Sequence, residues 1–350
     1  MRKNVVLVLG PLALAIAFAA CAPNASQDSL KPAGPYAREV RDLFVPVFWV
    51  AVAVFVIVEG LIVFFLFKYR HREGQDRLPP QIHGNTRLEI GWTILPAVVL
   101  AVVMVPTVAT IWDLARKPPS DALNITVIGQ QWWWKFEYTD VDMQTAAEVP
   151  GPITTANELV IPTGRVVYLT LTTGAGGIGD ADVIHSFWVP ELAGGQDAIP
   201  NHENHILLQA DEPGTYEGQC KEFCGLSHTI MKFHVRAVTP EAFAAWSAGQ
   251  KEDAITPSGG LAASGFDAFM QTCITCHAIQ GTPAQGIAGP DLTHFASREC
   301  IVGCLLPNDP EDIAAWLRDP PAIKEGSFMP DYDLSEDEID ALVAYLQTLE

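Results

Sequence analysis

Two long apolar stretches near the N-terminus constrain the fold of this 350-residue chain more than any other feature. They run from residue 43 to 67 and from residue 90 to 112. Each exceeds the roughly 20 residues that a helix needs to cross the hydrocarbon core of a bilayer. The short loop between them carries five Lys or Arg side chains, and loops of that kind stay in the cytoplasm. We therefore predict a two-helix transmembrane hairpin within residues 36–117, with both long flanks on the outer side of the membrane.

The extreme N-terminus is typical of a signal peptide, because two basic residues precede a short apolar run over residues 5–20. We assign residues 1–21 to this segment. The run ends in Phe-Ala-Ala-Cys21, which resembles a bacterial lipobox although Phe stands where Leu is usual. Cys21 is therefore either a lipidation site or an incidental thiol.

One ionisable residue, Glu59, lies well inside the first apolar stretch. A carboxylate in a bilayer is costly unless it faces protein or water, so we expect Glu59 to face a partner subunit. The alternative is a carboxylate that is neutralised in a contact between helices.

The exported remainder of the chain is strongly acidic, with 9 Lys or Arg against 33 Asp or Glu over residues 118–350. Such a surface excludes nucleic acid as a partner, since phosphate binding needs basic side chains. It favours the attraction of basic partner proteins, although a surface that only maintains solubility has the same composition.

Between residues 124 and 237, short β-rich runs alternate with Gly and Pro turns, which is typical of an all-β sandwich or barrel. One run is unusually aromatic and contains Trp132, Trp133 and Trp134. Because side chains alternate across a strand, at least one of these rings should be exposed while others fill the core.

The segment from Cys220 to Met231 holds two thiols, an imidazole and a thioether. Thiolate and thioether select copper(I) and imidazole suits both copper oxidation states, so this set predicts a copper site for electron transfer. Cys220 and Cys224 could bridge two metal ions, and two terminal histidines are then required. His228 lies in the segment, and His185, at the end of an upstream β-rich run, is the other candidate. A structural zinc ion and a disulfide between the two cysteines are the alternatives.

A second chemical signal is Cys273-Ile-Thr-Cys276-His277, the C-x-x-C-H signature of covalent c-type haem. The two thiols add to the haem vinyl groups, and His277 is the proximal ligand. Helical periodicity on both sides predicts an all-α domain over residues 265–350. Residues 241–264 are predicted to be a linker, which would hold this domain at a millimolar effective concentration without a tight docking surface.

The segment around Cys220 and Cys224 resembles the binuclear CuA motif of subunit II of haem-copper cytochrome c oxidases. The residues that carry the resemblance are Cys220, Glu222, Cys224, His228 and Met231, with His185 upstream in Val-Ile-His-Ser-Phe. It extends over residues 36 to about 240 and implies an all-β cupredoxin domain for residues 118–240.

The resemblance also implies a role for each of these residues. Cys220 and Cys224 would bridge two copper ions, with His185 and His228 as terminal ligands. Met231 and the backbone carbonyl of Glu222 would be weak axial ligands. The Glu222 side chain would face a magnesium ion shared with subunit I.

Further roles are implied outside the copper motif. Trp132, Trp133 and Trp134 would lie beside the copper site and receive electrons. Glu89 would lie near the mouth of a proton channel in subunit I, with a neutralised helix contact as the alternative. Residues 201–205, Asn-His-Glu-Asn-His, depart from the family, which commonly has Gly-Arg there. Their two histidines are either solvated or a metal-binding pair.

The C-terminal domain resembles a small class I cytochrome c. Met329 stands where that family places its distal ligand, with Met270 and His294 as rivals. Ligation by Met and His raises the haem potential, which suits a donor to copper. Cys300 and Cys304 are additions to the pattern, and in an oxidising compartment we expect them to form a local disulfide, with free thiols as the alternative.

None of the nine histidines lies in either apolar stretch, so the chain cannot itself ligate the intramembrane metals at which these oxidases reduce oxygen. The resemblance therefore implies the electron-input subunit of a haem-copper terminal oxidase. It would pass electrons from haem c to CuA and on to subunit I, where oxygen is reduced to water and protons are pumped. Its partners would be subunit I, subunit III and an upstream donor, namely cytochrome c, a cupredoxin or a quinol-cytochrome c reductase.

The implied location is the bacterial cytoplasmic membrane, as a multi-pass protein with its cupredoxin and cytochrome domains on the outer side. Two other functions remain open. A CuA-bearing subunit of a nitric oxide reductase would share the copper motif. A free-standing membrane-anchored electron carrier is disfavoured by the two spans and by Glu59.

Overall fold

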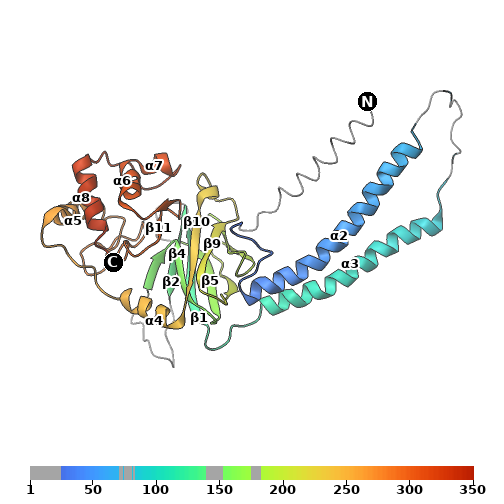
Figure 1. Ribbon diagram of the computed structural model, residues 1–350, viewed down its shortest axis with the longest axis horizontal. Coiled ribbons are helices and arrows are strands. Elements are labelled where there is room, and N and C mark those ends of the chain that lie inside the picture. The colour runs from blue at the N-terminus through green and yellow to red at the C-terminus, as the bar shows by residue number, and fades with distance from the viewer. Residues whose placement is uncertain (1–24, 71–73, 75–80, 82, 139–152, 175–182) are drawn as a thin grey trace.

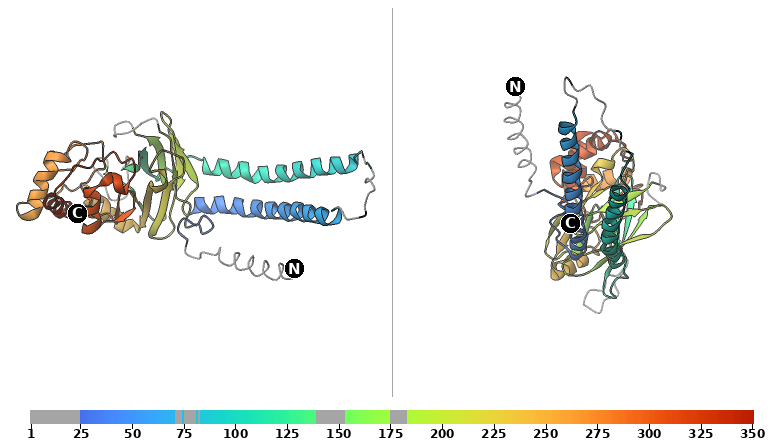
Figure 2. Two further views of the ribbon diagram at one scale, coloured as in Figure 1. Left: turned by 90° about the horizontal axis from the view of Figure 1, so that it is seen from above. Right: turned by 90° about the vertical axis from the view of Figure 1, so that its right-hand side faces the viewer.

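The computed structural model describes residues 25–70, 74, 81, 83–138, 153–174 and 183–350. The predicted signal peptide and Cys21 lie outside the described residues. Three parts follow one another along the chain, namely a helical hairpin, a β-sandwich and a small helical domain (Figure 1). The hairpin extends from one side of the sandwich and the helical domain lies on the opposite side (Figure 2). This arrangement places the C-terminal domain farthest from the cytoplasmic end of the hairpin.

The hairpin consists of α2 (Pro35–Lys68) and α3 (Thr86–Leu114). Pro35 begins α2, where its missing N–H leaves no partner unsatisfied, and the Asn85 side chain caps α3 by accepting from two backbone N–H groups. Their most apolar windows have mean hydropathies of 2.9 and 2.5 and are 0% buried by the rest of the chain. The two predicted apolar helices are therefore present, with apolar surfaces that only lipid or partner subunits can cover.

The central domain is a sandwich of two five-stranded sheets. One sheet has the order β3-β2-β1-β5-β8, with strands Ile153–Ala156, Trp133–Tyr138, Leu123–Gln130, Val167–Thr173 and Asn204–Leu208. The other has the order β4-β10-β9-β6-β7, with strands Glu158–Pro162, Lys232–Val238, Gly214–Cys220, His185–Trp188 and Gly195–Ala198. The all-β prediction is confirmed.

Alternation along these strands builds the core between the sheets. In β2 every second side chain is buried, and Trp134 and Phe136 are fully buried. They pack edge-on or tilted against Phe233 of β10, at ring distances of 5.5 and 6.0 Å. Each buried aromatic side chain of this kind contributes about 1.5–3 kcal/mol by leaving water.

The predicted linker begins as a docked helix. In α4 (Pro240–Gly249), Phe243 and Trp246 lie against Tyr138 of β2, with ring centroids 6.5 and 5.3 Å away. The expectation of a simple flexible tether is therefore wrong for this part of the linker, because its apolar face is packed on the sandwich.

The C-terminal domain has its own hydrophobic core. Its elements are α5 (Gly260–Thr272), β11 (Cys300–Ile301), β12 (Leu306–Pro307), α6 (Pro310–Arg318), α7 (Pro320–Ile323) and α8 (Glu336–Leu346). Helices α5 and α8 cross where Phe266 and Phe269 contact Tyr345 edge-on, at 5.5 and 5.7 Å. The sequence predicted helices on both sides of the C-x-x-C-H motif, and α5 and α8 are these helices.

Candidate functional site

The loop between β9 and β10, residues 220–231, gathers most of the predicted soft ligands; we call it the ligand loop. The sulfur atoms of Cys220 and Cys224 are 3.9 Å apart. His228 Nδ1 and Met231 Sδ each lie 3.7 Å from Cys224 Sγ. His185 Nδ1 lies 3.9 Å from Cys220 Sγ. The five side chains predicted from the sequence therefore face one another.

Strand pairing explains why His185 reaches a loop 35 residues away in the chain. It begins β6, which pairs with β9 so that Phe187 lies opposite Cys220. The short 3₁₀ helix η1 (His228–Ile230) and a hydrogen bond from Cys220 N to the Met231 carbonyl, 3.0 Å long, close the loop. Backbone hydrogen bonding thus fixes the ligand spacing before any metal binds.

The ligand loop fits a copper centre better than either alternative. Cys220 and Cys224 are buried but are not bonded to each other, so the structure contradicts the disulfide. A thioether beside two thiols and two imidazoles is the soft set that copper prefers, whereas a structural zinc site closes with four ligands. The hydrogen bond from Cys224, opposed by burial, lowers the pKa of Cys220. The same pairing and burial raise the pKa of Cys224.

Glu222 lies at the edge of this cluster. Its backbone carbonyl oxygen is 3.2 Å from Cys220 Sγ, where a weak axial ligand is predicted. Its side chain is exposed in the isolated chain. The shared magnesium site stays a prediction.

The residues of the predicted haem site line a cavity in the C-terminal domain, which we call the haem-type cavity. Cys273, Cys276, His277 and Met329 all contribute to its wall. His277 Nδ1 donates to the Pro290 carbonyl at 2.7 Å, because a carbonyl oxygen can only accept, and this leaves Nε2 free for iron. Burial lowers the pKa of His277, which keeps the imidazole neutral as a metal ligand must be. These residues fit a covalent haem.

The rival sixth ligands lie elsewhere. Neither Met270 nor His294 lines the cavity, and His294 Nδ1 is hydrogen-bonded to the backbone oxygen of Glu350 at 2.7 Å. Met270 packs in the domain core. This placement supports Met329 as the distal ligand.

Sequence reasoning missed Arg298, which also lines the cavity. Its guanidinium is partly buried, donates to the Asp291 carbonyl, and has a pKa lowered by burial. A guanidinium in the cavity wall could form charge-assisted hydrogen bonds with the carboxylate groups of a haem. Its only signal in the sequence is that Arg298 is one of few basic residues in an acidic domain.

The cupredoxin-type domain contributes part of the same cavity wall. Gln131, Trp132 and Trp133 line it together with Phe328 of the C-terminal domain. Trp132 is 6% exposed and stacks on Phe328, with centroids 5.8 Å apart and an interplanar angle of 8°. On its other side, Trp132 Nε1 donates to the Cys224 carbonyl at 2.9 Å.

The expectation of an exposed ring among the three tryptophans is wrong. Trp134 is fully buried in the sandwich, Trp133 is only partly exposed, and Trp132 is covered by the C-terminal domain. Trp132 lies in the turn before β2, where strand alternation does not apply, and Phe328 of the C-terminal domain stacks on its ring.

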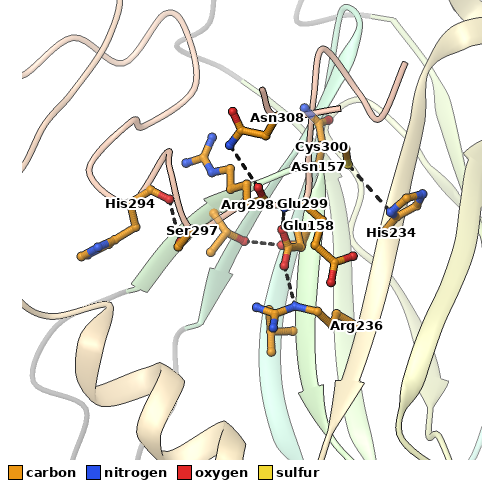
Figure 3. Close-up of polar contacts among 12 residues, drawn as sticks. Asn157, Glu158, His234, Arg236, His294, Ser297, Arg298, Glu299, Cys300 and Asn308 are labelled. Atoms are coloured by element: carbon orange, nitrogen blue, oxygen red, sulfur yellow. Dashed lines mark hydrogen bonds and ion pairs between the residues drawn. The ribbon is translucent and has the colours of Figure 1, made fainter. Parts of the chain in front are cut away.

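Polar contacts extend this interface between the domains (Figure 3). We call the set formed by Glu158, Arg236, His234, Glu299 and Cys300 the polar strip. Glu158 of β4 accepts from Arg236 Nε at 2.6 Å and from the backbone N–H of Glu299 at 3.4 Å. Beside it, Cys300 Sγ lies 3.8 Å from His234 Nδ1. The two domains are thus held by specific contacts.

Cys300 and Cys304 form the expected disulfide. They lie at the turn between β11 and β12. His205 stacks on Tyr168 at 4.9 Å and lies 3.3 Å from Thr170 Oγ1, while His202 is exposed. Among the described residues, no cluster of three metal-binding side chains includes either histidine.

Two carboxylates lie on the hairpin. Glu89 is in the first turn of α3, where its side chain accepts from Asn85 N at 3.3 Å and complements the helix dipole. Glu59 is exposed on α2 in the isolated chain. Their roles toward partner subunits stay predictions.

Comparisons with known proteins cover all three parts of the chain. Residues 24–110 match the family described as cytochrome c oxidase subunit II, transmembrane domain, and residues 123–238 match its periplasmic domain. Residues 262–350 match the cytochrome c family.

Three relatives carry the name cytochrome c oxidase subunit 2. The protein from Alkalihalophilus pseudofirmus is 37% identical, covering 96% of this chain and 94% of that protein. The protein from Bacillus sp. strain PS3 is 35% identical over 80% of both chains. The Bacillus subtilis protein is 32% identical, covering 92% of this chain and 91% of its own.

Proposed function

The chain belongs to the cytochrome c oxidase subunit II family and carries a C-terminal cytochrome c domain, and from this premise we propose that it is the electron-input subunit of a haem-copper terminal oxidase. Two membrane passes anchor it, with the periplasmic domain outside. The proposed membrane is the bacterial cytoplasmic membrane. Subunit I would reduce oxygen to water there and pump protons.

When bound, a binuclear copper centre and a covalent haem c would each supply one-electron redox chemistry. The residues that would hold copper are His185, Cys220, Cys224, His228, Met231 and the Glu222 carbonyl. Cys273 and Cys276 would attach the haem, with His277 and Met329 as axial ligands. The protein's own contribution is to hold both ligand sets in buried surroundings, at fixed separation.

The double contact of Trp132 carries this proposal. Its ring lies on the wall of the haem-type cavity and its Nε1 donates to the carbonyl of a copper-ligand residue, Cys224. One side chain therefore touches both sites, and the domain interface excludes water from it. Trp132 is the proposed electron-input residue, with Trp133 beside it and Trp134 packed edge-on against His185 at 5.9 Å.

The partners follow from exposed features. Glu222 is exposed next to the ligand loop, where it would share magnesium with subunit I. Glu89 would lie at the mouth of a proton channel of subunit I, and subunit III would complete the complex. The acidic outer surface favours a basic upstream donor, which could be cytochrome c, a cupredoxin or a quinol-cytochrome c reductase.

The test begins with purification of the intact complex in mild detergent and identification of the large subunit that co-purifies. Rapid mixing with a reduced basic cytochrome should then reduce the haem first and the copper afterwards. Copper reduction that precedes haem reduction would contradict the proposed route. A co-purifying large subunit that reduces nitric oxide, or none at all, would replace the proposed oxidase with one of the other two functions.

A further inference from the structure

A short segment of the C-terminal domain, Lys324–Met329, lies along the ligand loop; we call it the docking segment. It follows α7 and leads to the predicted distal ligand of the haem. Its contacts reach the ligand loop and the tryptophan that touches that loop. The proposed function uses only Met329 from this segment.

Lys324 makes the most unusual of these contacts. Its side chain is 5% exposed, and Nζ donates to the Trp132 carbonyl at 2.6 Å and to the Val302 carbonyl at 3.4 Å. Among the described residues it forms no ion pair with a carboxylate. Burying an ammonium group without a carboxylate is costly, so its placement at the domain interface needs a reason.

Trp132 transmits this contact to the ligand loop. Its carbonyl accepts from Lys324, while its indole Nε1 donates to the Cys224 carbonyl. Only one residue therefore separates the buried ammonium from a copper-ligand residue. Burial lowers the pKa of Lys324 to about 8, and negative charge on the Cys224 sulfur, when that thiol is ionised, opposes this shift.

The next residues of the docking segment hold the ligand loop directly. Ser227, which is fully buried beside His228, donates through Oγ to the Glu325 carbonyl at 2.6 Å. Gly326 has φ of +78°, and a Cβ there would lie 2.9 Å from side-chain atoms of Leu226 and Trp132. Only glycine fits so close an approach without a shift of its neighbours.

The same segment sets the position of Met329. The backbone N–H of Ser327 donates to the Lys324 carbonyl at 2.9 Å, and Ser327 Oγ accepts from Met329 N at 3.2 Å. A turn that starts at Lys324 thus ends at Met329, on the cavity wall. A displacement of Lys324 would move the sulfur atom.

We propose that Lys324 is a positioning residue that couples the two sites, so that the occupancy of the ligand loop changes the ligation of the haem iron by Met329 through the docking segment. The inference rests on the proposed function for the identity of the two bound groups. A lysine that served only to stabilise the interface would lower stability on replacement, but it would leave no dependence of one site on the other.

The decisive experiment is an equilibrium measurement on the full-length protein in its complex, with and without copper. The readouts are the charge-transfer band of methionine-ligated ferric haem and the haem reduction potential. In the wild type, copper removal should weaken the band and shift the potential. In Lys324→Met both should become independent of copper.

The matched control is Arg318→Met, which removes one positive charge from the same domain at a side chain that is 50% exposed. In Arg318→Met, the charge-transfer band and the haem potential should still change on copper removal. Lys324→Arg, which restores a buried cationic donor, should recover part of this copper dependence. If Lys324→Met does not assemble, Phe328→Leu, which weakens the stack on Trp132, should reduce the dependence.

A kinetic measurement completes the test. Haem-to-copper transfer should slow by about tenfold or more in Lys324→Met, since small displacements of reacting groups have effects of that size. The coupling would be overturned if the charge-transfer band of the wild type did not change on copper removal. It would also be overturned if the band and the haem potential of Lys324→Met still depended on copper as they do in the wild type. If the wild type shows coupling but no haem-to-copper transfer, the proposed function fails and the coupling stands.

Discussion

The ligand loop and the haem-type cavity are built in different ways. The ligand loop takes all but one of its side-chain ligands from residues 220–231, and strand pairing supplies the other, His185. Residues from both ends of the C-terminal domain line the cavity, and residues of the neighbouring β-sandwich form part of its wall. A site of the first kind should form whenever its domain folds, whereas a site of the second kind depends on how two domains dock.

The sharpest test of this difference is Cys220→Ser. Loss of one of the two proposed bridging thiolates should abolish the spectrum of one electron shared between two copper nuclei, while haem attachment stays complete. Electron paramagnetic resonance and haem quantitation measure the two effects. The double variant Cys300→Ser, Cys304→Ser is the control, because it removes two sulfur atoms outside the ligand loop. A wild-type spectrum from a single copper nucleus would refute the binuclear assignment.

Trp132→Leu should break the link between the two sites. Haem-to-copper transfer should slow by about 10–100-fold, because the side chain that touches both sites is lost. Gln131 Nε2 still donates to the Cys224 carbonyl at 2.8 Å, so copper should remain bound. Stopped-flow absorbance gives the rate.

Trp133→Leu is the matched control for this experiment. Trp133 lines the same cavity, but no hydrogen bond from its ring to the ligand loop is present among the described residues. An equal slowing in both variants would show that wall packing, not the contact of Trp132 with Cys224, governs the rate.

Much of this comparison could be predicted from the sequence, and the reason is the local nature of the signals. Two apolar stretches, one soft-ligand segment and one C-x-x-C-H motif identified the three parts of the chain. Strands β3 and β7 were not predicted, because Ile153–Ala156 and Gly195–Ala198 are short and mostly polar or small. Their pairing with β2 and β6 stabilises them as strands.

Contacts between domains could not be predicted in this way. Lys324 is separated from Trp132 by 192 residues, and no periodicity relates them. The absence of any pattern between distant segments also explains the wrong expectation for the tryptophans, since Trp132 lies in a turn before β2 and the sequence does not show that Phe328 covers it. Arg298 was missed because one charged residue carries no pattern.

Met329→His should lower the haem potential while the haem stays attached, because thioether ligation favours the ferrous state. Met270→Leu is the control and should leave the potential unchanged, since Met270 does not line the cavity. Redox titration of both variants measures the effect. An unchanged potential in Met329→His would return Met270 or His294 to consideration.

The docked interface should also respond to pH through Lys324. Its pKa is about 8 when buried, against 10.5 for a free lysine. Above pH 8 the unfolded chain therefore holds a proton that the folded chain has released, so stability rises with pH toward 10.5. The full effect is on the order of 3 kcal/mol, and below pH 8 this group adds no slope.

Urea unfolding of the wild type and of Lys324→Met between pH 7 and about 9.5 would measure the pH-dependent contribution of Lys324 to stability. The titration of tyrosines cancels in the comparison, because both proteins contain the same tyrosines. The difference in unfolding free energy should grow in favour of the wild type above pH 8. A difference that is constant across this range would show that Lys324 is not desolvated in solution.

The smallest effect concerns the disulfide between Cys300 and Cys304, which closes a short loop at the domain interface. By the chain-entropy relation such a loop contributes about 2 kcal/mol, and the ligand loop does not depend on it. The double variant Cys300→Ser, Cys304→Ser should therefore lower the thermal midpoint of the C-terminal domain by a few degrees and leave the copper spectrum unchanged.

His234 lies 3.8 Å from Cys300 Sγ, so the loosened turn should also become more accessible beside β10. Hydrogen exchange over residues 299–306 and calorimetry would measure both changes. Greater exchange in residues 324–329 of the same variant would show that the polar strip, as well as Lys324, holds the docking segment in place.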